Sequence, residues 1–443
     1  MTIINIESSD EEEERLVKVY QREELMRIGA HSDTSLELPS WTSEVLTKHP
    51  DCGHIIFPAI TEALEEEPDP ALAWDSEILE DLKQSNNSLE EDLVRLSGKL
   101  EISEERRELL GQLAQQVETS LHSEFPGCRV VPYGSFSSGF AFENCDLDVY
   151  TNLGRSVFDE SSAKPSHKWS AREKTRVVAD ILRRTERFRS ATAVTNAKIP
   201  IVKIKDRRTG IRCDVNSSSS MGVKNSQFLN FCKNYDRRVE QLVKIVKYFA
   251  YKHGVIDSGI GPHFNSYTVV VMVIFFLQSK LILPTVASLQ KDIPEDICEN
   301  WNFAFDKDKK RSSENNEPIS ELLLEFFRFY ASFPFSSEVI SPNVGIPVSK
   351  QIIQSGEWPL DMSDPDKKIG SLGKKLKTHK EVVIQDPFEL SKNLSKNVSS
   401  SRLAHLISSC QFGVNIIESV IDGTSQLYKL FRDDQLEENK EVQ

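Results

Sequence analysis

Residues 133–150 read YGSFSSGFAFENCDLDVY, and this stretch decides how the chain is interpreted. A Gly-Ser turn precedes two aspartates, Asp146 and Asp148, which are separated by one leucine. Because side chains alternate across a strand, carboxylates two positions apart share one face. The pair is either a solvated strand end or a site for hard divalent cations, which prefer oxygen ligands. The rest of the chain has to decide between these alternatives.

A third carboxylate, Asp214, lies in the strand-like stretch IRCDVN at 211–216. If its strand lies beside that of Asp148, three carboxylates meet at one sheet edge. Three such oxygen ligands suit two Mg²⁺ or Mn²⁺ ions whose remaining ligands come from phosphates and water. Gly134 would let the backbone approach a phosphate closely, and the Ser135 hydroxyl can donate to a phosphate oxygen. The spacing therefore predicts a two-metal site for chemistry on a nucleoside triphosphate.

The order of elements predicts an α+β fold with a small sheet backed by helices. A helical stripe ends at FPG (125–127), and four strand-like pieces follow, with a helix over 170–188 among them. The strand-like pieces are 129–133, 147–153, 199–205 and 211–216. From Asp236 onward the spacing is helical, and the apolar run from Tyr267 to Leu277 predicts a buried helix because it is too short to span a bilayer. Ser88 and Glu91 form a predicted capping box where order is expected to begin.

Charge divides the chain into an acidic extension and a neutral body. The net charge is −14, yet residues 1–80 hold 20 Asp and Glu against 5 Lys and Arg. Within the body, residues 168–212 carry 14 Lys and Arg against four acids, which is either a phosphate-binding surface or a solvated basic helix and strand edge. The seven cysteines show no metal-binding spacing, and with no signal peptide they favour a reduced compartment. We expect a cytoplasmic location, with the nucleus as the alternative.

The ordered motifs resemble one known family. YGSFSSGFAFENCDLDVY and RCDVN are followed by VKNSQFLNFCKNYDRRVEQLVKIVKYFAYKHGV (223–255), HFNSYTVVVMVIFFLQ (263–278) and QDPFELSKNLSKNVSS (385–400). This succession, over roughly residues 85–425, is similar to the terminal uridylyltransferases and noncanonical poly(A) polymerases of the DNA polymerase beta-like nucleotidyltransferase superfamily. The resemblance implies a bilobed molecule, with a small mixed-sheet palm domain packed against a largely helical PAP-associated domain. The implied divisions are N-terminal helices packing on the helical domain (81–123), the catalytic domain (124–220), the helical domain (221–430, with the PAP-associated segment at about 319–425) and a tail (431–443). Residues 1–80 lie outside the resemblance, and their acidic composition predicts a disordered extension.

The resemblance also implies a role for individual residues. Asn225 and Ser226 would contact the ribose, Lys247 the triphosphate, Ser266 a phosphate, and Tyr267 would stack on the base. The alternatives are that Lys247 is an exposed lysine on an amphipathic helix and that Tyr267 packs in the core. The metal ligands implied are the same three already derived, Asp146, Asp148 and Asp214, and the triphosphate turn is again Gly134 and Ser135.

Two positions depart from the family pattern. A second lysine usually found four residues after the first is replaced by Tyr251, with Lys252 adjacent as a candidate substitute. Uridine-selecting members carry a histidine after D-P-F, where this chain has Lys392. A lysine ammonium only donates hydrogen bonds, so it favours uracil O4 over the adenine amino group, although it could also reach adenine N1 or point to solvent. Asp386 and Glu389 are predicted to orient Lys392.

We therefore expect an enzyme that adds uridine from UTP, untemplated, to single-stranded RNA 3′ ends. The alternatives are the same reaction with ATP, an oligoadenylate or cyclic-dinucleotide synthetase, and an inactive RNA-binding scaffold. No RNA-binding module is visible in the sequence, so RNA would be held by the basic 168–212 region and the lysine-rich 367–380 segment. A protein adaptor would then select targets, and no membrane partner is expected.

Overall fold

The structure is a computed structural model that describes residues 70–159, 166–256, 263–355 and 376–432. The predictions for residues 1–69, for 367–375 and for 433–443 lie outside these ranges. The described residues from Trp74 onward belong to one compact unit.

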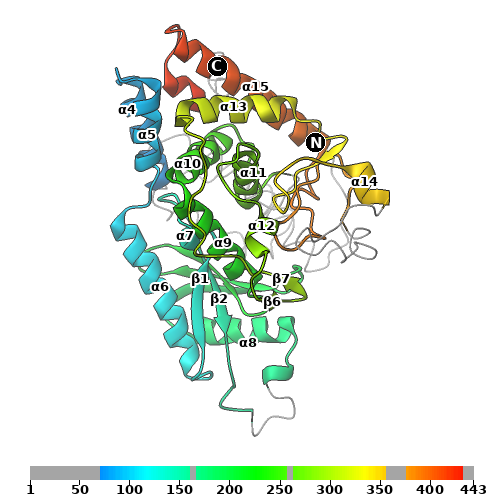
Figure 1. The fold of residues 1–443 in the computed structure, drawn as a ribbon. Helices are drawn as coiled ribbons and strands as arrows, with labels where there is room; N and C mark the ends of the chain where they lie inside the picture. Colours follow the sequence, from blue (N-terminus) through cyan, green and yellow to red (C-terminus); the bar gives the residue numbers. More distant parts are fainter. Residues whose placement is uncertain (1–69, 160–165, 257–262, 356–375, 433–443) are drawn as a thin grey trace, which may run out of the picture. The chain divides into compact units, whose positions relative to one another are not determined.

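A five-stranded mixed sheet forms the first part of this unit (Figure 1). Its strands run in the order β1-β2-β5-β4-β3, and β2 and β5 are parallel whereas the other neighbours are antiparallel. Their bounds are β1 Arg129–Tyr133, β2 Leu147–Asn152, β3 Phe188–Val194, β4 Ile201–Asp206 and β5 Arg212–Asn216. The small mixed sheet of the α+β prediction is confirmed.

Two helices cover one face of the sheet, namely α6 (Glu104–His122) and α8 (Ala171–Arg184). The strand residues on this face, among them Leu147, Val149 and Val215, are buried in a core shared with both helices. Alternation along β2 and β5 then directs Asp148 and Asp214 to the opposite face. The apolar core thus fixes which face of the sheet presents the carboxylates.

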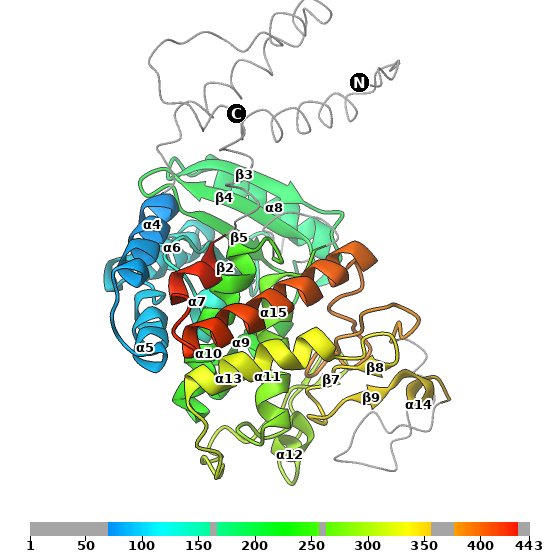
Figure 2. The same cartoon turned by 90° about the horizontal axis from the view of Figure 1, so that it is seen from above.

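Helices form the second part of the unit, around a separate and larger core (Figures 1 and 2). The main helices are α9 Met221–Tyr235, α10 Arg237–Lys252, α11 Ser266–Ser279, α13 Ile319–Ser332 and α15 Ser400–Ile421. The shorter elements are α12 Val286–Gln290, α14 Lys350–Ser355, the 3₁₀ helices Ser166–Lys168 and Leu427–Phe431, and the two-residue strands β6 Ile297–Cys298, β7 Trp301–Asn302, β8 Glu338–Val339 and β9 Val348–Ser349. Figure 2 shows α13 and α15 side by side, in agreement with their packing. Helix α11 is buried on all sides from Thr268 to Gln278, as its apolar sequence predicts.

The N-terminal helices differ from the sequence predictions in two respects, namely where the ordered chain begins and where α6 packs. Helix α4 (Pro70–Lys83) precedes the expected start of order at Ser88. Helix α5 (Leu89–Lys99), which carries the predicted Ser88–Glu91 capping box, packs on α10 and α13 of the helical part. Helix α6 was expected there too, but its apolar stripe packs on the sheet instead, because the buried strand residues offer it a matching apolar face.

Two elements differ from what the sequence pattern predicts. Strand β3 begins where the predicted helix 170–188 was expected to end, since α8 stops at Arg184. The sequence pattern does not predict helix α9, because its apolar residues do not gather on one side and its amphipathic pattern is weak. Helix α9 is important for the site, because it carries the predicted ribose-contacting residues.

Candidate active site

Asp148 and Asp214 lie side by side on neighbouring parallel strands. They are register partners between β2 and β5. Burial raises the pKa of Asp148 to about 7, and the charges of Asp214 and Asp146 act in the same direction. Burial likewise raises the pKa of Asp214, against the opposing effect of Lys203. The arrangement concentrates negative charge at one edge, and a bound cation would relieve it.

Two basic side chains already contact this edge. Arg212 Nε lies 3.1 Å from Asp146 Oδ1, and Lys203 Nζ lies 3.2 Å from Asp214 Oδ2. Asp146, which is exposed, is thus held by Arg212, while its charge still acts on Asp148. Within the described ranges, no three His, Cys, Asp or Glu side chains stand close enough together to hold one metal ion.

The donor chemistry at the edge nevertheless fits divalent cations. Asp148 and Asp214 offer adjacent oxygen ligands. Burial and the charge of Asp214 raise the pKa of Asp148, and a bound cation would lower it. The two ion pairs that hold Asp146 and Asp214 involve exposed partners and are weak in water. Asp148 and Asp214 are therefore placed to hold metal, and Asp146 would join them on leaving Arg212.

The turn at Gly134 is built around Asp148. Gly134 has φ of +72°, and a Cβ placed on it would lie 2.3 Å from Asp148 Oδ2, so only glycine fits. The residues Gly134–Ser138 form the short helix α7 directly after β1. In the described part of the chain, the Ser135 hydroxyl makes no hydrogen bond. The conformation of the turn is compatible with the predicted binding of triphosphate, which stays a prediction.

Helix α9 brings the two predicted ribose-contacting residues to the turn. Gly222 allows this approach, since a Cβ there would lie 2.8 Å from the Tyr133 ring. The Ser226 hydroxyl accepts a 2.8 Å hydrogen bond from the Gly134 amide and donates to the Gly222 carbonyl. Asn225 Oδ1 is buried and has no hydrogen-bond partner among the described residues. Ser226 thus holds the turn, whereas Asn225 offers an unused acceptor.

The two candidate triphosphate lysines on α10 are both engaged elsewhere. Lys247 is buried, donates to the Phe140 carbonyl and lies 4.5 Å from the Phe142 ring centroid. Burial lowers the pKa of Lys247 to about 8. Lys252 lies 2.7 Å from Asp75 of α4, which also accepts a hydrogen bond from Tyr248. In this arrangement Lys247 supports the loop after α7 and Lys252 ties α10 to α4, so their triphosphate roles stay predictions.

The predicted base-contacting residues form one polar cluster. Lys392 Nζ lies 3.3 Å from Asp386 Oδ2 and 3.4 Å from Glu389 Oε2, in the pairing expected from the sequence. The Tyr267 hydroxyl, at the start of α11, donates to the same Asp386 oxygen at 3.4 Å. Although burial opposes it, the two carboxylates raise the pKa of Lys392, which keeps its ammonium charged. Ser266, beside Tyr267, is half-buried at the first position of α11.

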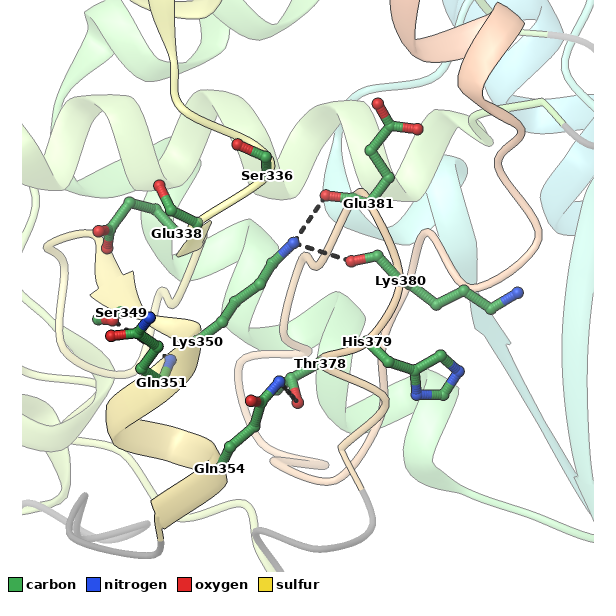
Figure 3. A pocket seen from close by; sticks show the side chains of 11 residues that line it. Ser336, Glu338, Ser349, Lys350, Gln351, Gln354, Thr378, His379, Lys380 and Glu381 are labelled. Atoms are coloured by element: carbon green, nitrogen blue, oxygen red, sulfur yellow. Dashed lines mark hydrogen bonds between the residues drawn. The ribbon is translucent and has the colours of Figure 1, made fainter.

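A separate pocket lies away from all these residues. It is lined by residues of β8, β9 and α14 and by the segment 378–381 (Figure 3). Lys350, at its centre, donates to the carbonyls of Phe335, Lys380 and Glu381. The lysine thereby fastens the PAP-associated loops, and the pocket contains no residue of the predicted site.

Lys203 and Arg212 were not predicted as individual members of the site. The sequence pattern indicates both residues only as members of the basic 168–212 region. Lys203 is the register partner of Asp214, and Arg212 precedes Asp214 by two positions on the same strand. Strand alternation alone would have placed Arg212 on the carboxylate face, but the pairing of β4 with β5 is a tertiary fact that the sequence does not give.

Comparison with protein families agrees with this geometry. Residues 89–234 match the family described as "Poly(A) RNA polymerase, mitochondrial-like, central palm domain", and residues 318–392 match the "Cid1 family poly A polymerase" domain. Two segments of the chain thus match domains described for poly(A) polymerases. The resemblance inferred from the motifs is confirmed.

Curated relatives include enzymes of both base preferences. The chain is 28% identical to the speckle targeted PIP5K1A-regulated poly(A) polymerase of Xenopus tropicalis, over 70% of this chain and 42% of that protein. It is 29% identical to the mitochondrial poly(A) RNA polymerase of Mus musculus (75% and 56%) and 30% identical to terminal uridylyltransferase 4 of the same species (61% and 15%). The chain thus spans about half or less of the length of these relatives.

Solved structures confirm the bilobed fold. The structure of mtPAP in complex with UTP matches with a TM-score of 0.66 at 23% identity, covering 81% of this chain and 75% of that one. A cytoplasmic RNA terminal U-transferase matches with a TM-score of 0.62 at 22% identity, covering 78% and 98%. Within the described residues, no helix combines the length and apolar character that crossing a membrane requires.

Proposed function

We propose that the chain is a template-independent nucleotidyltransferase that adds uridine from UTP to RNA 3′ ends and releases pyrophosphate. The observation that carries this proposal is the pairing of Asp148 with Asp214 on adjacent parallel strands, directly beside the Gly134 turn. Nucleotidyl transfer needs metal ligands and a phosphate-binding backbone within reach of each other. The two paired carboxylates and the Gly134 turn, which lie at one sheet edge, support these roles.

Each part of the edge has a task in this reaction. Two divalent cations held by Asp146, Asp148 and Asp214 would supply charge stabilisation at the triphosphate and at the RNA 3′-hydroxyl. The Ser135 hydroxyl would bind a phosphate oxygen, at a turn that the Gly134 amide closes by donating to Ser226. The buried Asn225 Oδ1 would accept a hydrogen bond from the ribose 2′-hydroxyl, which distinguishes a ribonucleotide from a deoxyribonucleotide.

Lys392 supports the choice of UTP. Its ammonium is held between Asp386 and Glu389, beside the hydroxyl end of Tyr267. A donor in this place complements uracil O4 and leaves the adenine amino group facing another donor. ATP is the alternative substrate, because poly(A) polymerases stand among the relatives.

The exposed basic residues of the palm would hold the RNA backbone, and target choice would fall to an adaptor. Steep weakening of RNA binding with salt is expected from phosphate contacts. We place the reaction in the cytoplasm.

The test is extension of a labelled single-stranded RNA with Mg²⁺ and each nucleoside triphosphate supplied separately. UTP should support the fastest extension, and Asp148→Asn should abolish it. Extension with ATP alone would overturn the uridine assignment. An absence of extension with every nucleotide, by a folded chain that binds RNA, would favour the scaffold alternative.

A further inference from the structure

A lysine of the palm reaches into the predicted base-selecting segment. Lys198 lies in the loop between β3 and β4, and its Nζ is 2.8 Å from Glu389 Oε1. The two residues are 191 positions apart and belong to different parts of the bilobed fold. Nothing in the sequence pattern singles out this lysine.

Glu389 is shared between two ammonium groups. One carboxylate oxygen faces Lys198 and the other faces Lys392. The glutamate side chain is 11% exposed, and its backbone amide donates to Asp386 Oδ1, so it has little freedom to move. Asp386, which is fully buried, holds Lys392 from the other side. A continuous chain of polar contacts therefore runs from Lys198 through Glu389, Lys392 and Asp386 to Tyr267.

The cluster is balanced in charge, with Lys198 and Lys392 against Asp386 and Glu389. Removing the charge of Lys198 would leave one uncompensated negative charge beside the base site. Glu389 would then attract Lys392 more strongly, and less of the ammonium's donor capacity would remain for a ligand. Both changes favour a base that donates, such as adenine through its amino group, over one that accepts at that place, such as uracil.

We infer that Lys198 is a positioning residue that sets nucleotide preference by sharing Glu389 with Lys392. This inference rests on the proposed function, since it assumes that Lys392 faces the base. Lys198 itself is largely exposed, so its ion pair contributes little to stability. Lys198 acts instead on whether the Lys392 ammonium donates to Glu389 or to the base of the nucleotide.

The experiment measures the dissociation constants of UTP and ATP by calorimetry, with Ca²⁺ in place of Mg²⁺ so that no reaction occurs. Lys198→Gln should lower the preference for UTP over ATP by about fivefold, a factor that corresponds to roughly 1 kcal/mol. Lys198→Arg should restore the wild-type ratio, because it keeps the charge. The matched control is Lys396→Gln, which removes an exposed positive charge from the segment that carries Lys392.

A structural role alone would not give this pattern, and the melting temperature of Lys198→Gln should equal that of the wild type. Equal ratios for Lys198→Gln and Lys396→Gln would overturn the inference. A wild-type chain that prefers ATP, but whose ratio still shifts toward ATP in Lys198→Gln, would contradict the uridine assignment and support the inference. A wild type that binds neither nucleotide would overturn both.

Discussion

The two polar centres of this molecule are built in opposite ways. At the sheet edge, carboxylates crowd together, and burial together with like charge raises the pKa of Asp148 to about 7. In the PAP-associated segment, Asp386 and Glu389 are matched by Lys392 and Lys198, and the charges balance. The first centre has three carboxylates against the two basic side chains Lys203 and Arg212, whereas the second has equal numbers of each charge.

This contrast assigns the chemical step to the sheet edge and the choice of nucleotide to the PAP-associated segment. A centre with excess negative charge is suited to bind metal cations and, through them, the triphosphate. The triphosphate is the same in every nucleotide. A centre that is already neutral can respond only to the pattern of donors and acceptors on a base. Changes at the sheet edge should therefore affect the rate with every nucleotide, and changes at the segment should affect the ratio between nucleotides.

The largest effect is expected from Asp148→Asn. Loss of a metal-binding charge should lower the rate of RNA extension by about 10³-fold with UTP and with ATP alike. The control is Asp180→Asn, which removes an exposed carboxylate of α8 that pairs only with Arg183 among the contacts described. A variant at position 148 that loses activity with one nucleotide and keeps it with the other would contradict this separation of rate from selectivity.

Gly134→Ala should lower activity by about 10²-fold, because the new Cβ would displace the Asp148 carboxylate. Gly210→Ala is the matched control, since Gly210 has a similar φ of +69° and open space around its Cβ position. Both variants carry the same backbone strain, so comparable melting temperatures with unequal extension rates would confirm the role of the close contact. Equal activities would contradict it.

Lys392→Met should change selectivity more than rate. Without the ammonium donor, the ratio of kcat/KM for UTP to that for ATP should fall by about tenfold, with the combined activity changing less. Steady-state extension assays with each nucleotide measure this ratio. Selectivity that stays at the wild-type value would show that Lys392 takes no part in base choice.

A pH effect should distinguish the two centres in the metal-free protein. The pKa of Asp148 is raised from 3.8 to about 7 by folding, so its contribution to stability is full below the unfolded value and is lost as pH rises from there through about 7. With EDTA, Asp148→Asn should melt roughly 2–4 °C above the wild type at pH 8, and the two should converge at about pH 4, where the carboxyl is protonated in both folded and unfolded chains. Thermal melts at both pH values check this, and a difference independent of pH would contradict it.

The smallest effect is expected from Arg212→Gln. Removing the side chain that pairs with Asp146 should strengthen binding of Mn²⁺ by about threefold, because the metal no longer competes with it. Calorimetric titration measures the change, with Arg208→Gln, an exposed palm arginine that pairs with Gln112, as the control. Unchanged or weaker metal binding in Arg212→Gln would show that the ion pair does not oppose the metal.

The two centres also differ in how far the sequence predicts them. The three carboxylates and the glycine turn follow from strand alternation and two short motifs, whereas the pairing of β2 with β5 that brings Asp148 beside Asp214 is a tertiary contact that the sequence leaves as a condition. The other strands of the sheet are predictable for the same reason, except for β3, whose sequence gives a weak strand signal. Lys198 and Lys203 were not predicted as members of either centre, because their positions depend on contacts between distant segments. The hydrogen bond from Gly134 to Ser226 was equally beyond sequence reasoning, since it requires the close approach of α9.

Uridine addition is tested most directly by supplying all four nucleoside triphosphates together, at equal concentration, to the wild-type chain with RNA and Mg²⁺. Sequencing of the extended 3′ ends then reads the reaction and the base choice in one experiment, with Asp148→Asn as the blank. We expect untemplated tails composed mainly of uridine, and none with the variant. Tails composed mainly of adenosine, or tails of equal length with Asp148→Asn, would contradict the proposed function.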